Sequence, residues 1–125
     1  MIKMIELRKA LETLLKTSAS NVYYQKAPKT AVMPYVVFDY PNSVDFGTLE
    51  NFVLDIDVWD DAVDTTALET LIDSIDISLH KIQIMVTDKV AIIPYRENRM
   101  APIDDDERIN RRKYVYQVRT YLKTY

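Results

Sequence analysis

Hydrophobic residues near the start of the chain recur at intervals of three and four, the spacing of an amphipathic helix. In residues 4–16 the apolar side chains share one helical stripe, and Glu12 is placed to pair with Lys16 on the solvent side. Ile2 and Ile5 lie off this stripe, so we expect either a first turn that is frayed or packed differently, or contacts of these two side chains beyond the core. The stripe consists of Met4, Leu7, Leu11, Leu14 and Leu15.

Short β-prone segments follow the first helix. The sequence predicts a brief strand at residues 22–24, a surface loop at residues 25–33 and a longer strand at residues 35–40. Pro34 and Pro41 bracket the longer strand. Because proline has no backbone N–H to donate, we expect this strand to end at the two prolines.

The clearest alternation of the chain lies in residues 52–58, where Asp55 and Asp57 stand between apolar neighbours. A period of two predicts a half-buried strand with the two aspartates on its solvated face. Gly47 marks residues 42–48 as a turn, through which this strand is expected to pair antiparallel with residues 35–40. The buried face consists of Phe52, Leu54, Ile56 and Val58.

A second amphipathic helix is predicted for residues 66–80. Thr66 and Glu69 have the spacing of a capping box at its start. Asp64 and Glu69 suit the positive end of the helix dipole, whereas His80 and Lys81 suit the negative end. The apolar stripe of this helix consists of Leu68, Leu71, Ile72, Ile75 and Leu79.

The remaining third of the chain is β-prone at both ends and polar in between. Residues 82–86 and 90–95 predict two strands, the second at an edge or irregular because it contains Pro94. Residues 96–112 are dense in charge and show no period, which predicts a loop, and residues 113–123 predict a long closing strand. This order predicts one α+β domain over residues 1–125, with a mostly antiparallel sheet and two amphipathic helices packed on one face.

The composition removes several classes of function. The 125 residues include no cysteine, which excludes disulfides, a thiolate nucleophile and cysteine-ligated metals. One glycine, Gly47, is too few for a phosphate-binding loop. The net charge of -3 argues against nucleic acid as the main partner. Because no apolar run is long enough to span a membrane and no secretory signal is visible, we expect the protein in the cytoplasm where it is made.

Five aspartates form a candidate metal site, namely Asp55, Asp57, Asp60, Asp61 and Asp64. Carboxylates that alternate along one strand face could hold Mg²⁺ or Ca²⁺, because hard cations need several oxygens in a small volume. In the alternative interpretation, the first two form the solvated face of a strand, and the other three form the loop and cap of the following helix. No glycine-bearing turn accompanies the aspartates, and we expect no bound metal or other cofactor.

A charged run is the candidate site for contacts with protein. Its members, in chain order, are Asp104, Asp105, Asp106, Glu107, Arg108, Arg111 and Arg112. One interpretation is a mobile, solvated loop with local ion pairs. The other is an acidic patch that meets a basic patch on a neighbouring copy, head to tail, which generates a ring. The nine tyrosines suit either cross-strand packing or an interface. No signature marks a catalytic partner for His80, so we expect no enzyme.

Several short motifs then occur in a characteristic order. These are Val-Tyr-Tyr at residues 22–24, Met-Pro-Tyr-Val-Val-Phe at residues 33–38 and Val-Leu-Asp-Ile-Asp-Val-Trp at residues 53–59. With the leading helix and the closing strand at residues 114–122, this layout resembles the tail-completion and tail-terminator proteins of long-tailed bacteriophages. The resemblance covers most of the chain and implies an α+β subunit of a six-fold ring that caps the tail tube and joins it to the head connector.

We therefore expect a structural tail-completion protein of a phage or prophage. Its implied partners are copies of itself, as a hexamer when assembled and either assembled or monomeric in solution, together with the tail tube protein and the head connector protein. We expect it in the host bacterial cytoplasm during assembly and then in the virion tail. The alternatives are a head-completion or neck protein, a regulatory or adaptor domain of a bacterial host, and a metal-dependent hydrolase that uses Asp55, Asp57 and Asp60.

Overall fold

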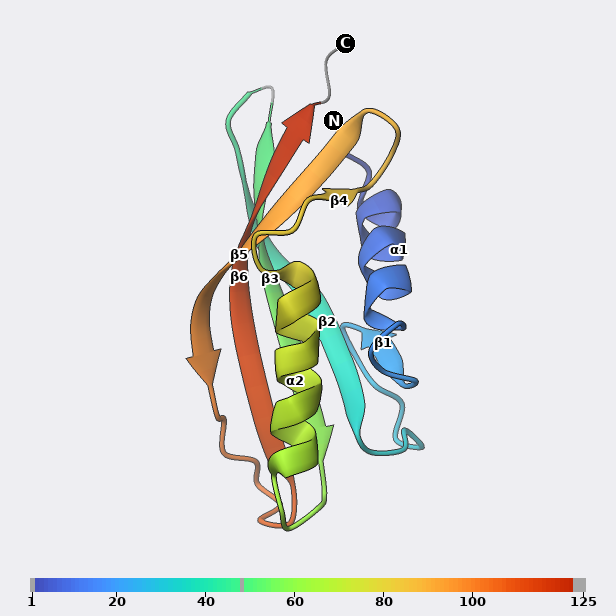
Figure 1. The fold of residues 1–125 in the computed structure, drawn as a ribbon, viewed down its shortest axis with the longest axis vertical. Coiled ribbons are helices and arrows are strands. Elements are labelled where there is room, and N and C mark those ends of the chain that lie inside the picture. Colours follow the sequence, from blue (N-terminus) through green and yellow to red (C-terminus); the bar gives the residue numbers. More distant parts are fainter. Residues whose placement is uncertain (1, 48, 123–125) are drawn as a thin grey trace.

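The computed structural model describes residues 2–47 and 49–122. The six strands form one sheet in the order β1-β2-β3-β6-β5-β4, in which every neighbouring pair is antiparallel except β1 with β2. Both helices pack on one face of this sheet (Figure 1), which confirms the predicted α+β architecture. The elements are α1 (Met4–Leu15), β1 (Val22–Tyr24), β2 (Tyr35–Asp45), β3 (Glu50–Asp60), α2 (Thr66–Leu79), β4 (Ile84–Met85), β5 (Val90–Met100) and β6 (Asn110–Leu122).

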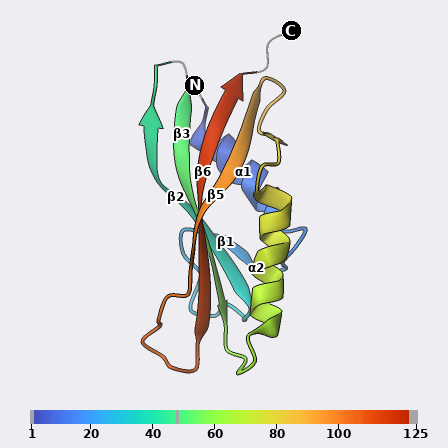
Figure 2. The same cartoon turned by 60° about the vertical axis from the view of Figure 1, so that its left-hand side comes forward.

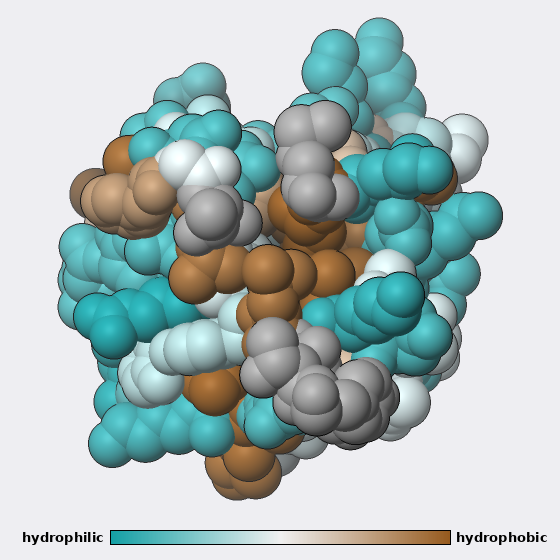
Figure 3. Space-filling model, turned by 90° about the horizontal axis from the view of Figure 1, so that it is seen from above, coloured by the Kyte–Doolittle hydropathy of each residue, from teal (hydrophilic) through white to brown (hydrophobic). Residues whose placement is uncertain are grey.

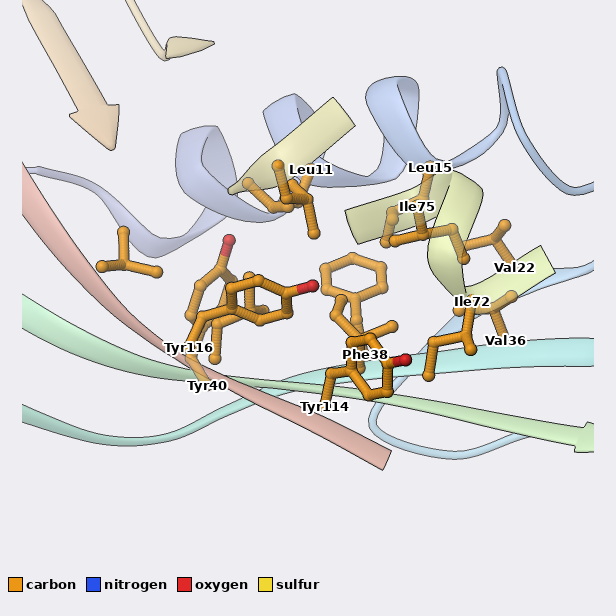
Figure 4. Close-up of a cluster of buried hydrophobic side chains, with 14 of the residues drawn as sticks. Leu11, Leu15, Val22, Val36, Phe38, Tyr40, Ile72, Ile75, Tyr114 and Tyr116 are labelled. Carbon is orange, nitrogen blue, oxygen red and sulfur yellow. The ribbon is translucent and has the colours of Figure 1, made fainter. Parts of the chain in front are cut away.

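The core lies between the helices and the sheet. Leu7, Leu11 and Leu15 of α1 are fully buried, as the helical stripe predicts. Met4 is the exception on the stripe, with 44% of its surface exposed, whereas Ile2 packs against the core. The first turn is therefore packed differently from the rest of the helix. Figure 4 shows leucines of α1 and isoleucines of α2 meeting aromatic side chains of the sheet. The sheet residues of this core cluster are Val22, Val36, Phe38, Tyr40, Phe52, Leu54, Ile56, Val58, Ile92, Tyr114, Tyr116 and Val118.

Helix α2 begins where the sequence predicts but is capped differently. Asp64 Oδ1 accepts hydrogen bonds from the backbone N–H of Thr66 at 2.9 Å and from its hydroxyl at 2.6 Å. The predicted capping box of Thr66 and Glu69 was therefore wrong. The N-cap residue is Thr65, so Glu69 lies one position too far along the helix for a capping box, and its side chain pairs with Arg112 of β6 at 2.9 Å.

Strand β2 is longer than predicted and passes through Pro41. The pairing of β2 with β3 shifts register between Asp39 and Asn42 and then continues to Asp45. This irregularity accommodates the missing N–H of the proline, so Pro41 interrupts the pairing locally and does not end the strand. Gly47 follows in the turn at φ 92°, a conformation that glycine adopts readily. The last residue of the predicted turn, residue 48, lies outside the described residues.

Strands β5 and β6 extend into the region predicted to be a loop. Strand β5 runs to Met100 and β6 begins at Asn110, so residues 101–109 connect them. The loop prediction for residues 96–112 was wrong at both ends, because cross-strand pairing, which a local pattern does not reveal, makes these polar segments extended. In the described part of the chain, β4 pairs with β5 at Ala91 and Ile92, so the rest of β5 lies at an edge, as Pro94 predicts. Residue 123, where the closing strand was expected to end, is not among the described residues.

The sheet is strongly twisted, and its connections gather at two ends (Figures 1 and 2). One end carries the connections 25–34, 61–65 and 101–109, and we call it the loop end. The opposite end carries the turn with Phe46 and Gly47 and the turn at residues 86–89, and we call it the hairpin end. The face of the sheet away from the helices is covered by no described helix or strand, and we call it the open face.

A polar network ties the second half of α2 to strands β5 and β6. The Tyr116 hydroxyl donates to Asp76 Oδ1 at 2.6 Å, and Arg96 Nη1 donates to Asp76 Oδ2 at 2.5 Å. Burial and the hydrogen bond to Asp76 raise the pKa of Tyr116, so its hydroxyl stays protonated and remains a donor. The backbone N–H of Arg96 donates to His80 Nδ1 at 2.9 Å, and His80 caps the helix C-terminus, where the sequence predicts it.

Replacing Asp76 with alanine should lower the free energy of unfolding by about 3 kcal/mol, because the Tyr116 hydroxyl and the Arg96 guanidinium would lose their acceptor in a part-buried site. Urea unfolding followed by circular dichroism measures this loss. The control is Asp61→Ala at an exposed position, which should change the free energy of unfolding by less than about 0.5 kcal/mol. Equal losses in the two variants would show that the network does not hold α2 on the sheet.

Candidate interaction surfaces

The connection between β5 and β6, residues 101–109, contains most of the predicted interface residues and is ordered by its own side chains. Asp104 Oδ1 accepts the N–H of Asp106 at 3.0 Å. Asp106 in turn binds Arg108 through Nε at 3.0 Å and through Nη2 at 2.9 Å. The hydrogen bonds from Arg108 lower the pKa of Asp106 to about 2, so this carboxylate is ionised at neutral pH. The local ion pairing expected for this loop is confirmed.

Arg111 and Arg112 lie on β6 and point to opposite faces of the sheet. Arg111 Nη2 lies 2.6 Å from Asp57 Oδ2 on the open face. Arg112 Nη2 lies 2.9 Å from Glu69 Oε1 of α2 on the helix side. The acids and bases of the charged run therefore do not form two compact patches, because its arginines each pair with an acid of their own chain.

The pair of Asp57 and Arg111 is largely buried. Asp57 is 7% exposed, so the expectation of a solvated carboxylate was wrong. Burial raises the pKa of Asp57, although the hydrogen bond from Arg111 acts in the opposite direction. Asp57 Oδ1 and Arg111 Nε are buried without a hydrogen-bond partner among the described residues. Desolvation thus outweighs attraction, and the rest of the fold holds this pair in place.

Aromatic side chains continue from this pair across the open face. Arg111 Cζ lies 4.4 Å from the ring centroid of Trp59. Trp59 stacks on Tyr35 with ring centroids 5.2 Å apart, and Tyr23 meets Tyr35 edge-on at 6.1 Å. These four residues, which we call the aromatic ladder, come from the neighbouring strands β6, β3, β2 and β1. The ladder confirms the cross-strand packing predicted for the tyrosines.

Trp59 was not among the candidate residues of the sequence analysis. The signal that locates it is the alternation along β3, because Trp59 follows Asp57 by two positions and therefore shares its face. Aromatic residues and arginine are the side chains that contribute most to binding energy in protein interfaces. The open face thus has the composition of a contact surface.

Four of the five aspartates of the metal hypothesis, all except Asp61, have side chains that the protein itself engages. Alternation along β3 puts Asp60 on the opposite face of the sheet from Asp55 and Asp57. Asp55 lies 3.4 Å from Lys113, and Asp60 accepts the N–H of Asp61 at 2.9 Å. Across residues 2–47 and 49–122, no group of three or more histidine, aspartate or glutamate side chains is placed to hold a metal ion. This arrangement does not favour the hydrolase alternative.

The hairpin end is apolar at its centre. Figure 3 shows hydrophobic side chains gathered there and surrounded by hydrophilic ones. A hollow at this end is lined in part by Ile2, Leu49, Val90 and Leu122, and Phe46 in the β2–β3 turn is 66% exposed. The loop end differs, because its connections are charged.

Within the described part of the chain, no helix has both the length and the apolar character that a membrane span requires.

The comparisons with known proteins agree with this fold. The sequence matches the family of tail completion protein gp17 over residues 6–121. The chain belongs to this family. The resemblance suggested by the short motifs is thereby confirmed, and the protein has a structural role in completing a phage tail. Among curated proteins, none matches the sequence.

Solved structures share the fold of this family member. One is a chain from the virion of a native gene transfer agent particle, with a TM-score of 0.72 and 15% sequence identity, over 91% of this chain and 93% of that chain. A second solved chain has a TM-score of 0.69 and 14% identity, over 100% of this chain and 99% of the other. At such identities the likeness shows a common fold.

The buried pair on the open face leads to a test of stability. Replacing Arg111 with methionine should lower the free energy of unfolding by about 3 kcal/mol near pH 7, because the buried Asp57 carboxylate would lose its closest cation. Asp57→Asn should cost less than Arg111→Met, because the amide carries no charge to desolvate. Urea unfolding of both variants beside the wild-type protein measures these losses.

The loss of stability in Arg111→Met should depend on pH and be smaller at low pH. Because the folded pKa of Asp57 is raised, its contribution to stability is present below the unfolded pKa and is lost as the pH rises through the folded pKa. Removing Arg111 raises the folded pKa further, so the loss in Arg111→Met should shrink between pH 7 and pH 5 as the carboxylate becomes protonated. A loss that stays constant over this range would contradict the assignment.

Proposed function

We propose that copies of this protein form a six-fold ring that caps the finished tail tube and joins the tail to the head connector. The match to the tail completion family over residues 6–121 carries this proposal. The tail tube protein and the head connector protein are the partners, and the protein assembles in the cytoplasm of the host bacterium before it becomes part of the virion tail.

The open face of the sheet supports a role in protein contacts. The face opposite to it carries α1 and α2 and forms the core, whereas the open face presents the aromatic ladder to its surroundings. A subunit with one face committed to its own core and another rich in aromatic residues is suited to bind neighbouring proteins.

The charged run at the loop end is the proposed subunit or partner interface. Arg108 has 86% of its side chain exposed although it pairs with Asp106, and Asp105 and Glu107 are exposed as well. A contact that joins two different surfaces of identical copies closes into a ring when its rotation permits. The proposed interface residues are Asp104, Asp105, Asp106, Glu107 and Arg108, together with Arg111 and Arg112, whose charges are already paired within the subunit.

Electron microscopy of particles from a phage that lacks this gene tests the proposal. We expect tubes of uncontrolled length or tails without heads, because nothing would occupy the growing end of the tube or bind the connector. Supplying the wild-type gene from a plasmid is the control and should restore normal virions. Normal virions without the gene would contradict the proposal. Binding of the purified protein to filled capsids but not to finished tails would instead assign it to the neck.

A further inference from the structure

Two connections at the loop end form one acidic surface. Residues 61–65 lead from β3 into α2, and residues 101–109 lead from β5 into β6. The Asn110 side chain donates to the Ala62 carbonyl at 3.0 Å and so holds the two connections together. The acids of this surface are Asp61, Asp64, Asp104, Asp105, Asp106 and Glu107.

The acidic surface keeps an excess of negative charge after its internal pairing. Arg108 neutralises Asp106, and the hydrogen bonds from Thr66 lower the pKa of Asp64. Asp105 and Glu107 are exposed, and neither pairs with a cation in the part of the chain that the structure describes. These two carboxylates are available to a binding partner.

The connection 25–34, which we call the lysine loop, carries the opposite charge. It contains Lys26 and Lys29 and no acidic residue, and no acid occurs between Glu12 and Asp39. Both lysines are exposed, and neither has an acidic partner within residues 2–47 and 49–122. The lysine loop is therefore a basic surface that the fold leaves unneutralised.

Hydrogen bonds within the subunit hold the lysine loop in shape. The Ala31 N–H donates to the Pro28 carbonyl at 2.9 Å, which closes a turn around Lys29. The Asn21 side chain donates to the Val32 carbonyl at 3.0 Å and fixes the far side of the loop. The acidic surface is held by the bonds described above. Loops ordered before binding lose little conformational entropy when they bind.

The two surfaces lie at the same end of the molecule, the lysine loop at the β1 edge of the sheet and the acidic surface at the connections of β3, β5 and β6 (Figure 1). The lysine loop follows β1, the outermost strand on one side, and residues 101–109 follow β5, which is outermost on the other side beyond its pairing with β4. Each surface also carries an exposed aliphatic side chain, Val32 at 66% and Ile103 at 97% exposure. Copies set side by side with parallel long axes bring one surface next to the other.

We propose that the lysine loop of one subunit binds the acidic surface of the next subunit. This inference rests on the ring of the proposed function and names the contact that closes it. Opposite charges steer the lysine loop and the acidic surface together. A contact between the acidic surfaces of two copies would instead set acid against acid. Arg111 and Arg112 are not the cations of this contact, because Asp57 and Glu69 of the same chain hold them.

Two charge-reversed variants test the contact. Lys26→Glu with Lys29→Glu makes the lysine loop acidic, and Asp105→Lys with Glu107→Lys makes the acidic surface basic. Each variant alone should associate about tenfold more weakly than the wild-type protein at low salt, with a smaller difference at high salt because ions screen exposed charges. Sedimentation velocity over a concentration series measures the association.

An equimolar mixture of the two variants provides the decisive measurement. Every contact in an alternating ring of the two again joins opposite charges, so the mixture should regain the wild-type association although neither variant does alone. The control carries Lys9→Glu with Lys81→Glu, which changes the net charge as much as the lysine-loop variant does but at exposed positions outside the loop end. It should associate like the wild-type protein.

Restoration of tails separates this inference from the proposed function. The same variants, and their mixture, are added to tails from a phage that lacks the gene, and complete virions are counted. If the wild-type protein restores virions but the mixture does no better than either variant, the contact is wrong and the proposed function stands. If the wild-type protein neither self-associates nor restores virions, both fail.

Discussion

The antiparallel pairing of β3 with β6 is the contact on which the rest of the structure depends. One face of this pair supplies apolar side chains to the core, and the other face sets acids of β3 against bases of β6. The register places Asp57 opposite Lys113 and Trp59 opposite Arg111. A slip of one residue would move the apolar set to the open face and the charges into the core. Core packing and charge pairing therefore select the same register.

This pairing also decides which charges remain for other molecules. Arg111, Arg112 and Lys113 of β6 are bound to acids of β3 and α2, and Arg96 of β5 is bound to Asp76. At the loop end, the exposed carboxylates of Asp105 and Glu107 and the lysine loop have no such partner among the described residues. The side chains of Asp105 and Glu107 and the lysines of the lysine loop therefore keep charges that can act between copies.

Local patterns predicted the parts of the fold that bury one regular face, namely α1, α2 and β3. The extension of β2 past Pro41 and of β5 to Met100 could not be predicted in this way, because these exposed segments are strands only through pairing with their neighbours. The candidate site could be predicted from the sequence in part, because residues 104–107 are four consecutive acids. The burial of Asp57 depends on a partner 54 residues away, and the lysine loop is marked only by the absence of acids around it.

A reconstruction by electron cryomicroscopy of the junction between the tail tube and the head would show whether copies of this protein meet through the lysine loop and the acidic surface. We expect a closed ring of this protein at the end of the tube, with residues 25–34 of each subunit against residues 61–65 and 101–109 of the next. A junction that lacks the protein, or that holds copies without contact between these segments, would contradict this expectation.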